Sequence, residues 1–308
     1  MRGYKIFAGS SSVEFAKEVC QSLDIPLSKA EIKRFSDGEI SVQIAESVRG
    51  RDVFIVQSTG APSNDNLMEL LIMTDALRRS SASSITAVVP YFGYARQDRK
   101  AAPRVPITAR LVADLIEKAG VDRVVTIDLH AGQIQGFFDI PVDNLYGSII
   151  FQEYIESKNL KNPIIASPDI GGVARARYFA EKLGLEMVIV DKRREKANEA
   201  EVMNIIGDVT GKDVIMIDDM VDTAGTMVKG AAALKANGAT SVMACATHGV
   251  LSGKAYENLK NDALDELCIS NSLVTKPMDK IKVLTVAPLF GEVIRRVYHN
   301  ESVNSLFS

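Results

Sequence analysis

The sequence predicts an α/β fold with two similar domains, each a mainly parallel sheet flanked by helices. Short runs rich in Val and Ile alternate with longer amphipathic segments along the whole chain, which is typical of buried parallel strands joined by helices. The chain has 308 residues, and at about 150 residues per domain this length fits two domains. The same order of elements also occurs twice, each time reaching a strand that ends in acidic residues.

The strands are expected where the runs rich in Val and Ile lie. They are Tyr4–Ala8, Val53–Gln57, Ser84–Pro90, Arg123–Leu129, Pro163–Ser167, Glu186–Val190, Asp213–Ile217, Ser241–Thr247 and Ile281–Val286. Helices are expected over Asn66–Ser80, Ile107–Ala119, Val173–Gly184 and Thr226–Asn237, mainly because apolar residues recur on one face. We place the domain boundary near residues 143–147, which gives domains of residues 1–145 and 146–308.

The composition and charge exclude several classes of protein. Apolar residues make up 46% of the chain, and 36 Lys and Arg against 39 Asp and Glu leave a formal net charge of −3. A nucleic-acid-binding protein usually has a strong basic excess, so we expect no nucleic-acid partner. No run approaches the ~18 apolar residues of a membrane-spanning helix, so we expect no membrane association and a cytoplasmic location. The 3 cysteines are widely spaced, which fits a reducing compartment.

The strongest local signal is the segment Val214–Thr226, V-I-M-I-D-D-M-V-D-T-A-G-T. A buried strand ends in the adjacent carboxylates of Asp218 and Asp219, at the sheet edge where ligands bind in open α/β folds. A turn then opens a helix whose free amides and two hydroxyls can bind one phosphate. Since the carboxylates can accept hydrogen bonds from vicinal sugar hydroxyls, we expect a site for a 5-phosphorylated ribose. The alternative is an ordinary helix cap without a ligand.

This segment resembles the phosphoribosyl diphosphate-binding motif of phosphoribosyltransferases and ribose-phosphate diphosphokinases. Five further segments are jointly similar to class I ribose-phosphate diphosphokinases, a resemblance that runs from Phe7 to Phe307. They are R-F-S-D-G-E from Arg34, Y-A-R-Q-D-R from Tyr94, D-L-H-A from Asp128, S-P-D-I-G-G from Ser167 and D-K-R-R from Asp191. The resemblance implies two phosphoribosyltransferase-like domains. It also implies transfer of the β,γ-diphosphoryl group of ATP to the C1 hydroxyl of ribose 5-phosphate, giving 5-phosphoribosyl 1-diphosphate and AMP for nucleotide biosynthesis.

The resemblance assigns a role to each segment. It implies that ribose 5-phosphate is bound by Asp218, Asp219, Asp222, Thr223, Ala224, Gly225 and Thr226. It implies that ATP is bound by Phe35, Asp37, Glu39, Arg96 and Gln97, with Phe35 stacked on the adenine. Mg²⁺ would be coordinated by His130 and Asp169. The catalytic residues would be Lys192 and Arg194 of a flexible loop, which stabilise transition-state charge, together with His130.

Each segment also has a plain structural interpretation. The F-S-D-G-E segment is compatible with an exposed β-turn, and the basic run Arg96–Arg104 with a solvated loop. A single histidine such as His130 is more often structural than a ligand. The polar segment Asp191–Glu199 is compatible with a mobile loop or the tip of a hairpin. Gly93 stands where this family usually has Pro, so we expect a looser backbone just before Arg96.

The resemblance further implies a homohexamer built from dimers, activated by phosphate and inhibited by ADP. The residues that match the family's effector segments are Ser47, Arg49, Ser302, Asn304 and Phe307. Asn304 stands where the family usually has Ser, and its amide can still donate a hydrogen bond to phosphate.

Two other functions fit part of the sequence. A phosphoribosyltransferase would use the Asp218–Thr226 segment in reverse and consume the diphosphate without needing ATP. A non-catalytic regulatory subunit of a synthetase would keep the fold but alter the catalytic loop. The residues Lys192, Arg194, His130 and Asp169 are all in place with no obvious insertion after Arg194, which favours an active enzyme.

Overall fold

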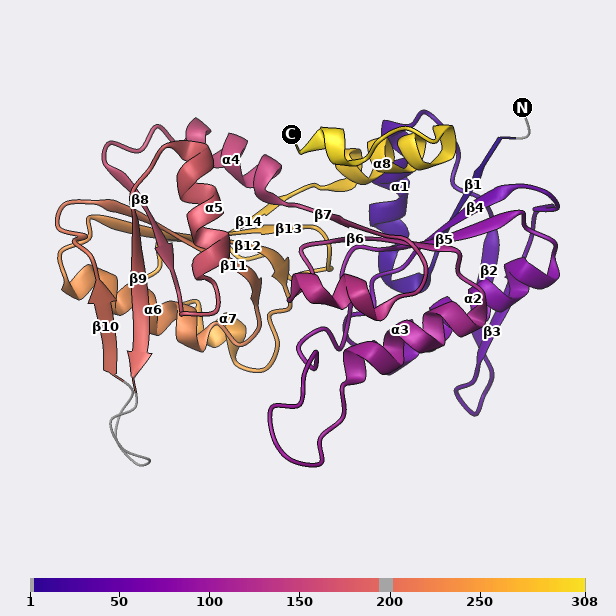
Figure 1. Cartoon of the computed structure of the whole chain (residues 1–308), viewed down its shortest axis with the longest axis horizontal. Coiled ribbons are helices and arrows are strands. Elements are labelled where there is room, and N and C mark those ends of the chain that lie inside the picture. The colour runs from indigo at the N-terminus through magenta and orange to yellow at the C-terminus, as the bar shows by residue number, and fades with distance from the viewer. Residues whose placement is uncertain (1–2, 194–201, 308) are drawn as a thin grey trace. The chain divides into compact units, whose positions relative to one another are not determined.

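The computed structural model describes residues 3–193 and 202–307 and divides them into two compact units. Unit 1 contains residues 3–146, 272–274 and 286–307, and unit 2 contains residues 147–193, 202–271 and 275–285. Each unit has a sheet of mainly parallel strands with helices against it (Figure 1), so the predicted α/β fold class is confirmed. Within the described residues, no helix is both long enough and apolar enough to cross a membrane.

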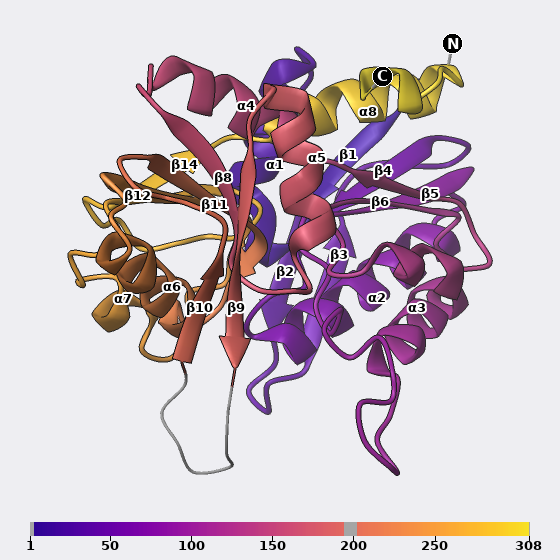
Figure 2. The ribbon, with the colours of Figure 1, turned by 60° about the vertical axis from the view of Figure 1, so that its left-hand side comes forward.

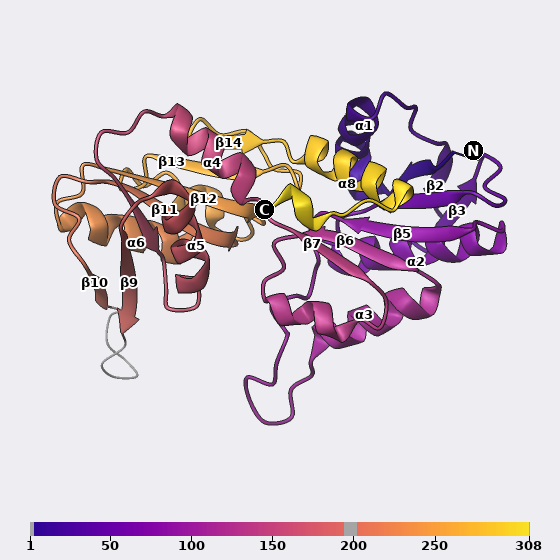
Figure 3. The ribbon, with the colours of Figure 1, turned by 45° about the horizontal axis from the view of Figure 1, so that its top comes forward.

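Unit 1 is built on a five-stranded parallel sheet in the order β1-β4-β5-β6-β7. The strands are β1 (Lys5–Ala8), β4 (Asp52–Val56), β5 (Ser84–Val89), β6 (Arg123–Ile127) and β7 (Val142–Leu145). One face packs against α1 (Val13–Ser22) and α8 (Ala287–His299), and the other against α2 (Ser63–Arg79) and α3 (Thr108–Ala119) (Figure 3). The antiparallel pair β2 (Ala30–Arg34) and β3 (Ile40–Ile44) lies beside α2. Three short 3-10 helices complete the unit, η1 (Ser10–Ser12), η2 (Gly132–Phe137) and η3 (Asn304–Leu306).

The C-terminal segment returns to unit 1, which differs from the sequence-based assignment of residues 146–308 to one domain. Helix α8 packs on α1, and the rings of Phe15 and Phe290 meet edge to face with centroids 5.4 Å apart. The two helices approach closely at Gly291, where an added Cβ would lie 2.2 Å from Ser22 Oγ. The apolar face of α8 is thus buried against an element about 275 residues earlier in the sequence, which no local pattern indicates.

Unit 2 has a seven-stranded sheet in the order β10-β9-β8-β11-β12-β13-β14. The strands are β8 (Pro163–Ser167), β9 (Met187–Arg193), β10 (Val202–Ile206), β11 (Asp213–Val221), β12 (Ser241–Gly249), β13 (Glu266–Ser270) and β14 (Ile281–Leu284). All neighbours are parallel except β9 and β10. The helices are α4 (Ser148–Ser157), α5 (Val173–Leu183), α6 (Gly225–Ala236) and α7 (Ala255–Asn258), with α5 and α6 on opposite faces of the sheet (Figure 2).

Strand β11 separates the two apolar cores of unit 2. Val214 and Met216 pack in the core that includes α6, whereas Ile215 and Ile217 pack in the core that includes α4 and α5. This alternation is that of a strand buried on both faces. It explains why the sequence of β11 is a continuous apolar run rather than an alternating one.

The expected strands are found within a few residues, but five strands were not expected. These are β2, β3, β7, β10 and β13. The polar segment Asp191–Glu199 does not begin as a loop, because β9 continues to Arg193 and pairs with β10. The antiparallel register joins Lys192 to Met203, so backbone pairing overrides the polar composition of Asp191–Arg193.

Candidate functional site

The predicted phosphate-binding segment is a tight turn between β11 and α6. The strand ends at Val221, and Ala224 precedes the helix in the left-handed conformation, with φ 60° and ψ 0°. A residue with a Cβ in this region is strained, and such strain is concentrated at ligand sites. Gly225 and the exposed Thr226 form the first turn of α6. Their backbone amides have no partner within the helix, so they are available to an anion at the positive end of the helix dipole.

A second segment, residues 251–258, supports this turn from outside. The amide of Leu251 donates to the carbonyl of Val221 (3.0 Å), and Asn258 Nδ2 donates to the carbonyl of Thr223 (2.8 Å). Ser252 donates to Asp222 twice, from its amide to the carbonyl (3.0 Å) and from its hydroxyl to the carboxylate. Sequence reasoning missed these supporting residues, since Asn258 lies 35 positions from its partner and no local pattern marks it.

The carboxylates of Asp218 and Asp219 share one cationic partner, Arg175 of α5. The guanidinium Nη1 lies 3.2 Å from Asp219 Oδ1 and 3.5 Å from Asp218 Oδ1. The amide of Asp219 also donates to Asp218 Oδ1 (2.8 Å). Burial, reinforced by the charge of Asp219, raises the pKa of Asp218 to about 8, while Arg175 acts in the opposite direction. The two predicted ribose-binding carboxylates therefore form an acidic pair, in which Asp219 is buried and Asp218 is partly exposed.

Asp169 follows β8, the parallel neighbour of β11. Its Oδ1 accepts a hydrogen bond from the amide of Gly172 (2.8 Å), and the hydroxyl of Ser167 donates to its carbonyl (2.7 Å). A Cβ at Gly172 would lie 3.0 Å from Ser167 Oγ, so the turn is tightly packed at this position. Asp169 is exposed and supplies the carboxylate oxygen that Mg²⁺ prefers, which fits its predicted role as a ligand.

His130 belongs to unit 1, where it follows β6 and is exposed. The preceding turn is held in place because the amides of Asp128 and Leu129 donate to the carbonyl of Leu145 (3.0 Å) and to Asn144 Oδ1 (3.1 Å). Asp128 has φ 43°, another strained position at the carboxyl end of a strand. An exposed imidazole there is accessible to a ligand, although nitrogen is not the usual donor to Mg²⁺.

The predicted adenine-binding residues lie on the turn between β2 and β3. The amide of Phe35 donates to the carbonyl of Glu39, and the amide of Gly38 donates back to Phe35 (both 2.9 Å). Asp37 Oδ1 accepts from the amide of Glu39 (3.1 Å). Phe35 is 59% exposed, so its ring is accessible to a ligand.

The second predicted ATP-binding segment follows β5, and α2 joins it to the first. Tyr94 hydrogen-bonds through its hydroxyl to Asn64, while Arg34 forms an ion pair with the neighbouring Asp65 (2.9 Å). Gln97 is fixed at the start of α3, where Thr108 Oγ1 donates to Gln97 Oε1 (2.6 Å). The structure thus ties both segments to the first turn of α2.

The backbone before Arg96 is held tightly rather than loosened by glycine. The amide of Gly93 donates to Thr59 Oγ1 (2.7 Å), and an added Cβ at Gly93 would lie 2.2 Å from the carbonyl oxygen of Thr59. The expected looseness is therefore wrong for this fold, because close backbone approach requires the glycine. Arg96 and Gln97 themselves are exposed.

The predicted catalytic loop lies mostly beyond the described residues. Lys192 is in β9, where its backbone pairs with that of Met203. Arg194 lies outside the described residues. The hairpin stem formed by β9 and β10 therefore places the backbone of Lys192 one residue from the end of a strand.

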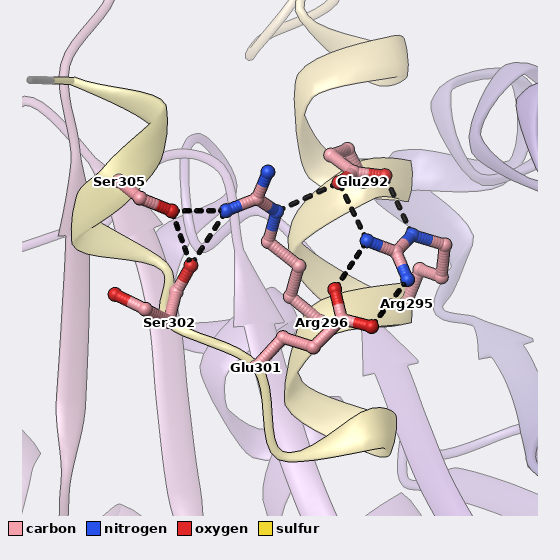
Figure 4. A network of polar contacts seen from close by, with 6 residues as sticks. All are labelled: Glu292, Arg295, Arg296, Glu301, Ser302 and Ser305. Carbon is pink, nitrogen blue, oxygen red and sulfur yellow. Dashed lines mark hydrogen bonds and ion pairs between the residues drawn. The ribbon is translucent and has the colours of Figure 1, made fainter.

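The C-terminal effector candidates are joined to α8 by a polar network (Figure 4). Arg296 donates to the carbonyl of Ser302 (2.6 Å) and to the hydroxyl of Ser305, and its Nε donates to Glu292 (2.7 Å). Arg295 binds Glu292 and Glu301. Arg295 and then Arg296 lower the pKa of Glu292 to about 2, so the network stays charged at all moderate pH values.

The remaining effector candidates are located in the same unit. Phe307 packs edge to face on Tyr146, with ring centroids 5.4 Å apart, which fixes the end of the described chain. Asn304, Ser47 and Arg49 are exposed. Their exposure makes all three accessible to an anion.

Comparisons with known proteins identify the family. Residues 4–120 match the N-terminal domain of ribose phosphate pyrophosphokinase, and residues 193–308 match the phosphoribosyl synthetase-associated domain. The ribose-phosphate pyrophosphokinases of Wolinella succinogenes and Campylobacter jejuni are each 73% identical to this chain over 308 residues, covering 100% of both sequences. The crystal structure of phosphoribosylpyrophosphate synthetase from Mycobacterium smegmatis has 42% identity and a TM-score of 0.92, covering 97% of this chain and 99% of that one.

These matches first define a class, the enzymes of ribose-phosphate chemistry. More narrowly, the chain belongs to the ribose-phosphate pyrophosphokinase family. The resemblance inferred from its sequence segments is thereby confirmed.

Proposed function

We propose that this chain is a ribose-phosphate pyrophosphokinase, which transfers the β,γ-diphosphoryl group of ATP to the C1 hydroxyl of ribose 5-phosphate. The observation that carries the proposal is the acidic pair of Asp218 and Asp219 beside the Asp222–Thr226 turn at one sheet edge. The acidic pair suits the two vicinal hydroxyls of ribose 5-phosphate, and the turn suits its phosphate. The names of the full-length relatives agree with this assignment.

The proposed reaction is an in-line substitution at the β-phosphorus of ATP. The C1 oxygen forms a bond to the β-phosphorus and its proton is released, while the bond from that phosphorus to the bridging oxygen of the α-phosphate breaks. AMP leaves, and 5-phosphoribosyl 1-diphosphate remains. The turn at Asp222–Thr226 holds the 5-phosphate, so the sugar is oriented before the reaction, and positioning supplies much of the rate in such transfers.

Charge on the polyphosphate must be neutralised during the transfer. In this proposal Lys192 and Arg194 approach the reacting phosphates and stabilise the transition state. Bound Mg²⁺, held by Asp169 and His130, would withdraw charge from the phosphate oxygens. The orientation of the Asp169 carboxylate, fixed by the amide of Gly172, supports its role as a ligand.

ATP binding is proposed for the two segments that α2 holds together. Phe35 would stack on the adenine, and Asp37 and Glu39 would accept hydrogen bonds from its amino group. Arg96 and Gln97 would bind the polyphosphate side, since a guanidinium can bind phosphate oxygens in a bidentate manner. The exposed ring of Phe35 and the anchoring of Gln97 by Thr108 support these roles.

Regulation and assembly are proposed as part of the same function. We propose a homohexamer built from dimers, located in the cytoplasm, with phosphate as an activator and ADP as an inhibitor. The effector residues would be Ser47, Arg49, Ser302, Asn304 and Phe307. The network around Arg296 supports this proposal because it gives the C-terminal segment a fixed conformation.

An AMP-release assay tests the proposed function. The full chain is incubated with ATP, Mg²⁺ and ribose 5-phosphate, with and without inorganic phosphate, and AMP and 5-phosphoribosyl 1-diphosphate are quantified. Equal amounts of both, formed only when the sugar phosphate is present, would support the proposal. A phosphoribosyltransferase would instead consume the diphosphate without ATP. A chain that is inert alone but changes a partner's rate would be a regulatory subunit.

Lys192→Ala tests the catalytic assignment. We expect turnover to fall by roughly two or more orders of magnitude, because one transition-state charge contact is lost, with little change in affinity for ribose 5-phosphate. Steady-state AMP release and calorimetric binding of ribose 5-phosphate would measure the two effects. Near-normal turnover in this variant would remove Lys192 from the mechanism.

A further inference from the structure

Arg175 contacts both ribose-binding carboxylates, although none of the family-like segments includes it. It is the third residue of α5, in the first turn of a helix whose first turn has no acidic side chain. A cation at this end of a helix is unfavourable, because the helix dipole is positive there. The positive charge of Arg175 therefore needs negative partners from another element, and these are Asp218 and Asp219 of β11.

The guanidinium of Arg175 bridges the carboxylates of Asp218 and Asp219. A single nitrogen, Nη1, lies 3.2 Å from Asp219 Oδ1 and 3.5 Å from Asp218 Oδ1. The side chain of Asp219 is only 5% exposed, whereas those of Arg175 and Asp218 are 24% and 25% exposed. One cation between two carboxylates offsets their mutual repulsion and limits how far each can rotate.

The strand pattern also places Arg175 on the correct face. Ile215 and Ile217 of β11 pack in the core that is shared with α5, so this face of β11 lies toward the helix that carries Arg175. The contact is therefore a consequence of the packing of α5 on the sheet.

We propose that Arg175 is a positioning residue for ribose 5-phosphate, holding the carboxylates of Asp218 and Asp219 in the orientation that accepts the vicinal hydroxyls of the sugar. This inference rests on the proposed function, because it assumes that the acidic pair binds the ribose. Each carboxylate must present an oxygen to a hydroxyl donor, and a protonated or rotated carboxyl does so poorly. The charge of Arg175 opposes the protonation of Asp218 that burial and the charge of Asp219 favour.

An ion pair that is merely structural, or an Arg175 that binds ATP, would give different kinetic results. A merely structural ion pair would change the melting temperature and the amount of active enzyme, but would leave the KM for ribose 5-phosphate unchanged. A direct contact with the polyphosphate of ATP would raise the KM for ATP instead. The positioning role predicts a rise in the KM for ribose 5-phosphate and no rise in the KM for ATP.

The test compares three variants of the full chain with the wild type. Arg175→Gln removes the charge, and Arg175→Lys keeps it. Arg177→Gln is the matched control, since Arg177 is exposed on the same helix two residues further along. AMP release gives kcat and both KM values, and calorimetry gives the Kd of ribose 5-phosphate without ATP.

We expect Arg175→Gln to raise the KM and Kd of ribose 5-phosphate at least tenfold while the KM for ATP changes less than twofold. Arg175→Lys should recover most of the affinity, and Arg177→Gln should match the wild type. An unchanged KM for ribose 5-phosphate, or an equal rise for ATP, would overturn the proposal. If Arg175→Gln does not fold, the Arg175→Lys variant provides the test. A purely structural role predicts no selective change in either KM. The proposal predicts a small rise in the KM for ribose 5-phosphate alone. A wild type that neither binds ribose 5-phosphate nor releases AMP would refute the proposed function itself.

Discussion

Replacing Asp218 by Asn should make the folded protein more stable at alkaline pH. Burial, together with the charge of Asp219, raises the pKa of Asp218 from 3.8 to about 8. Between these two values the folded state keeps a proton that the unfolded chain releases. The free energy of unfolding therefore falls as the pH rises from about 4 to about 8, and the stability present below pH 4 is lost across this window. Asp218→Asn removes this loss, because an amide resembles the neutral carboxyl at every pH.

The size of the expected gain in stability follows from the pKa shift of Asp218. A displacement of about four pK units corresponds to about 6 kcal/mol if all of it opposes folding. A quarter of the Asp218 side chain is exposed and Arg175 is adjacent, so water and the cation reduce this figure. We expect Asp218→Asn to gain roughly 1–3 kcal/mol at pH 8.5 and almost nothing at pH 4.5.

Thermal unfolding followed by circular dichroism at pH 4.5, 6.5 and 8.5 measures this gain. Protein concentration and heating rate must be constant, because binding partners and irreversibility shift the midpoint. Asp262→Asn is the control, since the side chain of Asp262 is fully exposed in the same unit. If wild type and Asp218→Asn differ by the same amount at all three pH values, burial of the acidic pair is not the cause. A variant less stable than wild type at pH 8.5 would also refute the reasoning.

Three further predictions concern residues that support the proposed substrate-binding and effector segments. Asn258→Ala removes the donor to the carbonyl of Thr223 and should raise the KM for ribose 5-phosphate about 3- to 10-fold; a change in the KM for ATP alone would contradict this. Gly93→Ala places a Cβ 2.2 Å from the carbonyl oxygen of Thr59, and should lower the unfolding free energy by about 2–4 kcal/mol in denaturant titrations; an unchanged midpoint would show that the backbone yields freely. Arg296→Gln frees the C-terminal segment and should raise several-fold the phosphate concentration that gives half-maximal activation, with kcat at saturating phosphate unchanged; an identical phosphate response would remove the network from regulation.

Much of the fold and of the ribose 5-phosphate site is encoded by residues that are close together in the sequence. The β11–α6 residues from Asp218 to Thr226 are consecutive, so an apolar run, two carboxylates and a Thr-Ala-Gly-Thr turn were enough to predict the loop. The longer parallel strands and the helices α2, α3, α5 and α6 were predicted for the same reason, since their hydrophobic patterns extend over many residues.

The strands that the sequence did not predict have weaker hydrophobic patterns. The hairpin of β2 and β3 is only partly buried, so its residues do not form an apolar run. Strand β10 is defined by its pairing with β9, and that pairing gives strand structure to the polar residues Asp191–Arg193. Propensity is overridden in such places by the hydrogen bonds of a neighbouring strand.

The sequence by itself determined the two α/β sheets, the order of their main elements and the family to which the chain belongs. Tertiary structure alone decided which residues support the acidic pair, because Arg175 and Asn258 are separated from their partners by 44 and 35 positions. It also decided that α8 packs with unit 1 and that Gly93 must lack a side chain. The reason is physical: a local pattern encodes the burial and backbone geometry of one segment, whereas a counterion, a supporting donor and a close approach come from segments that meet only when the sheet and its helices pack together.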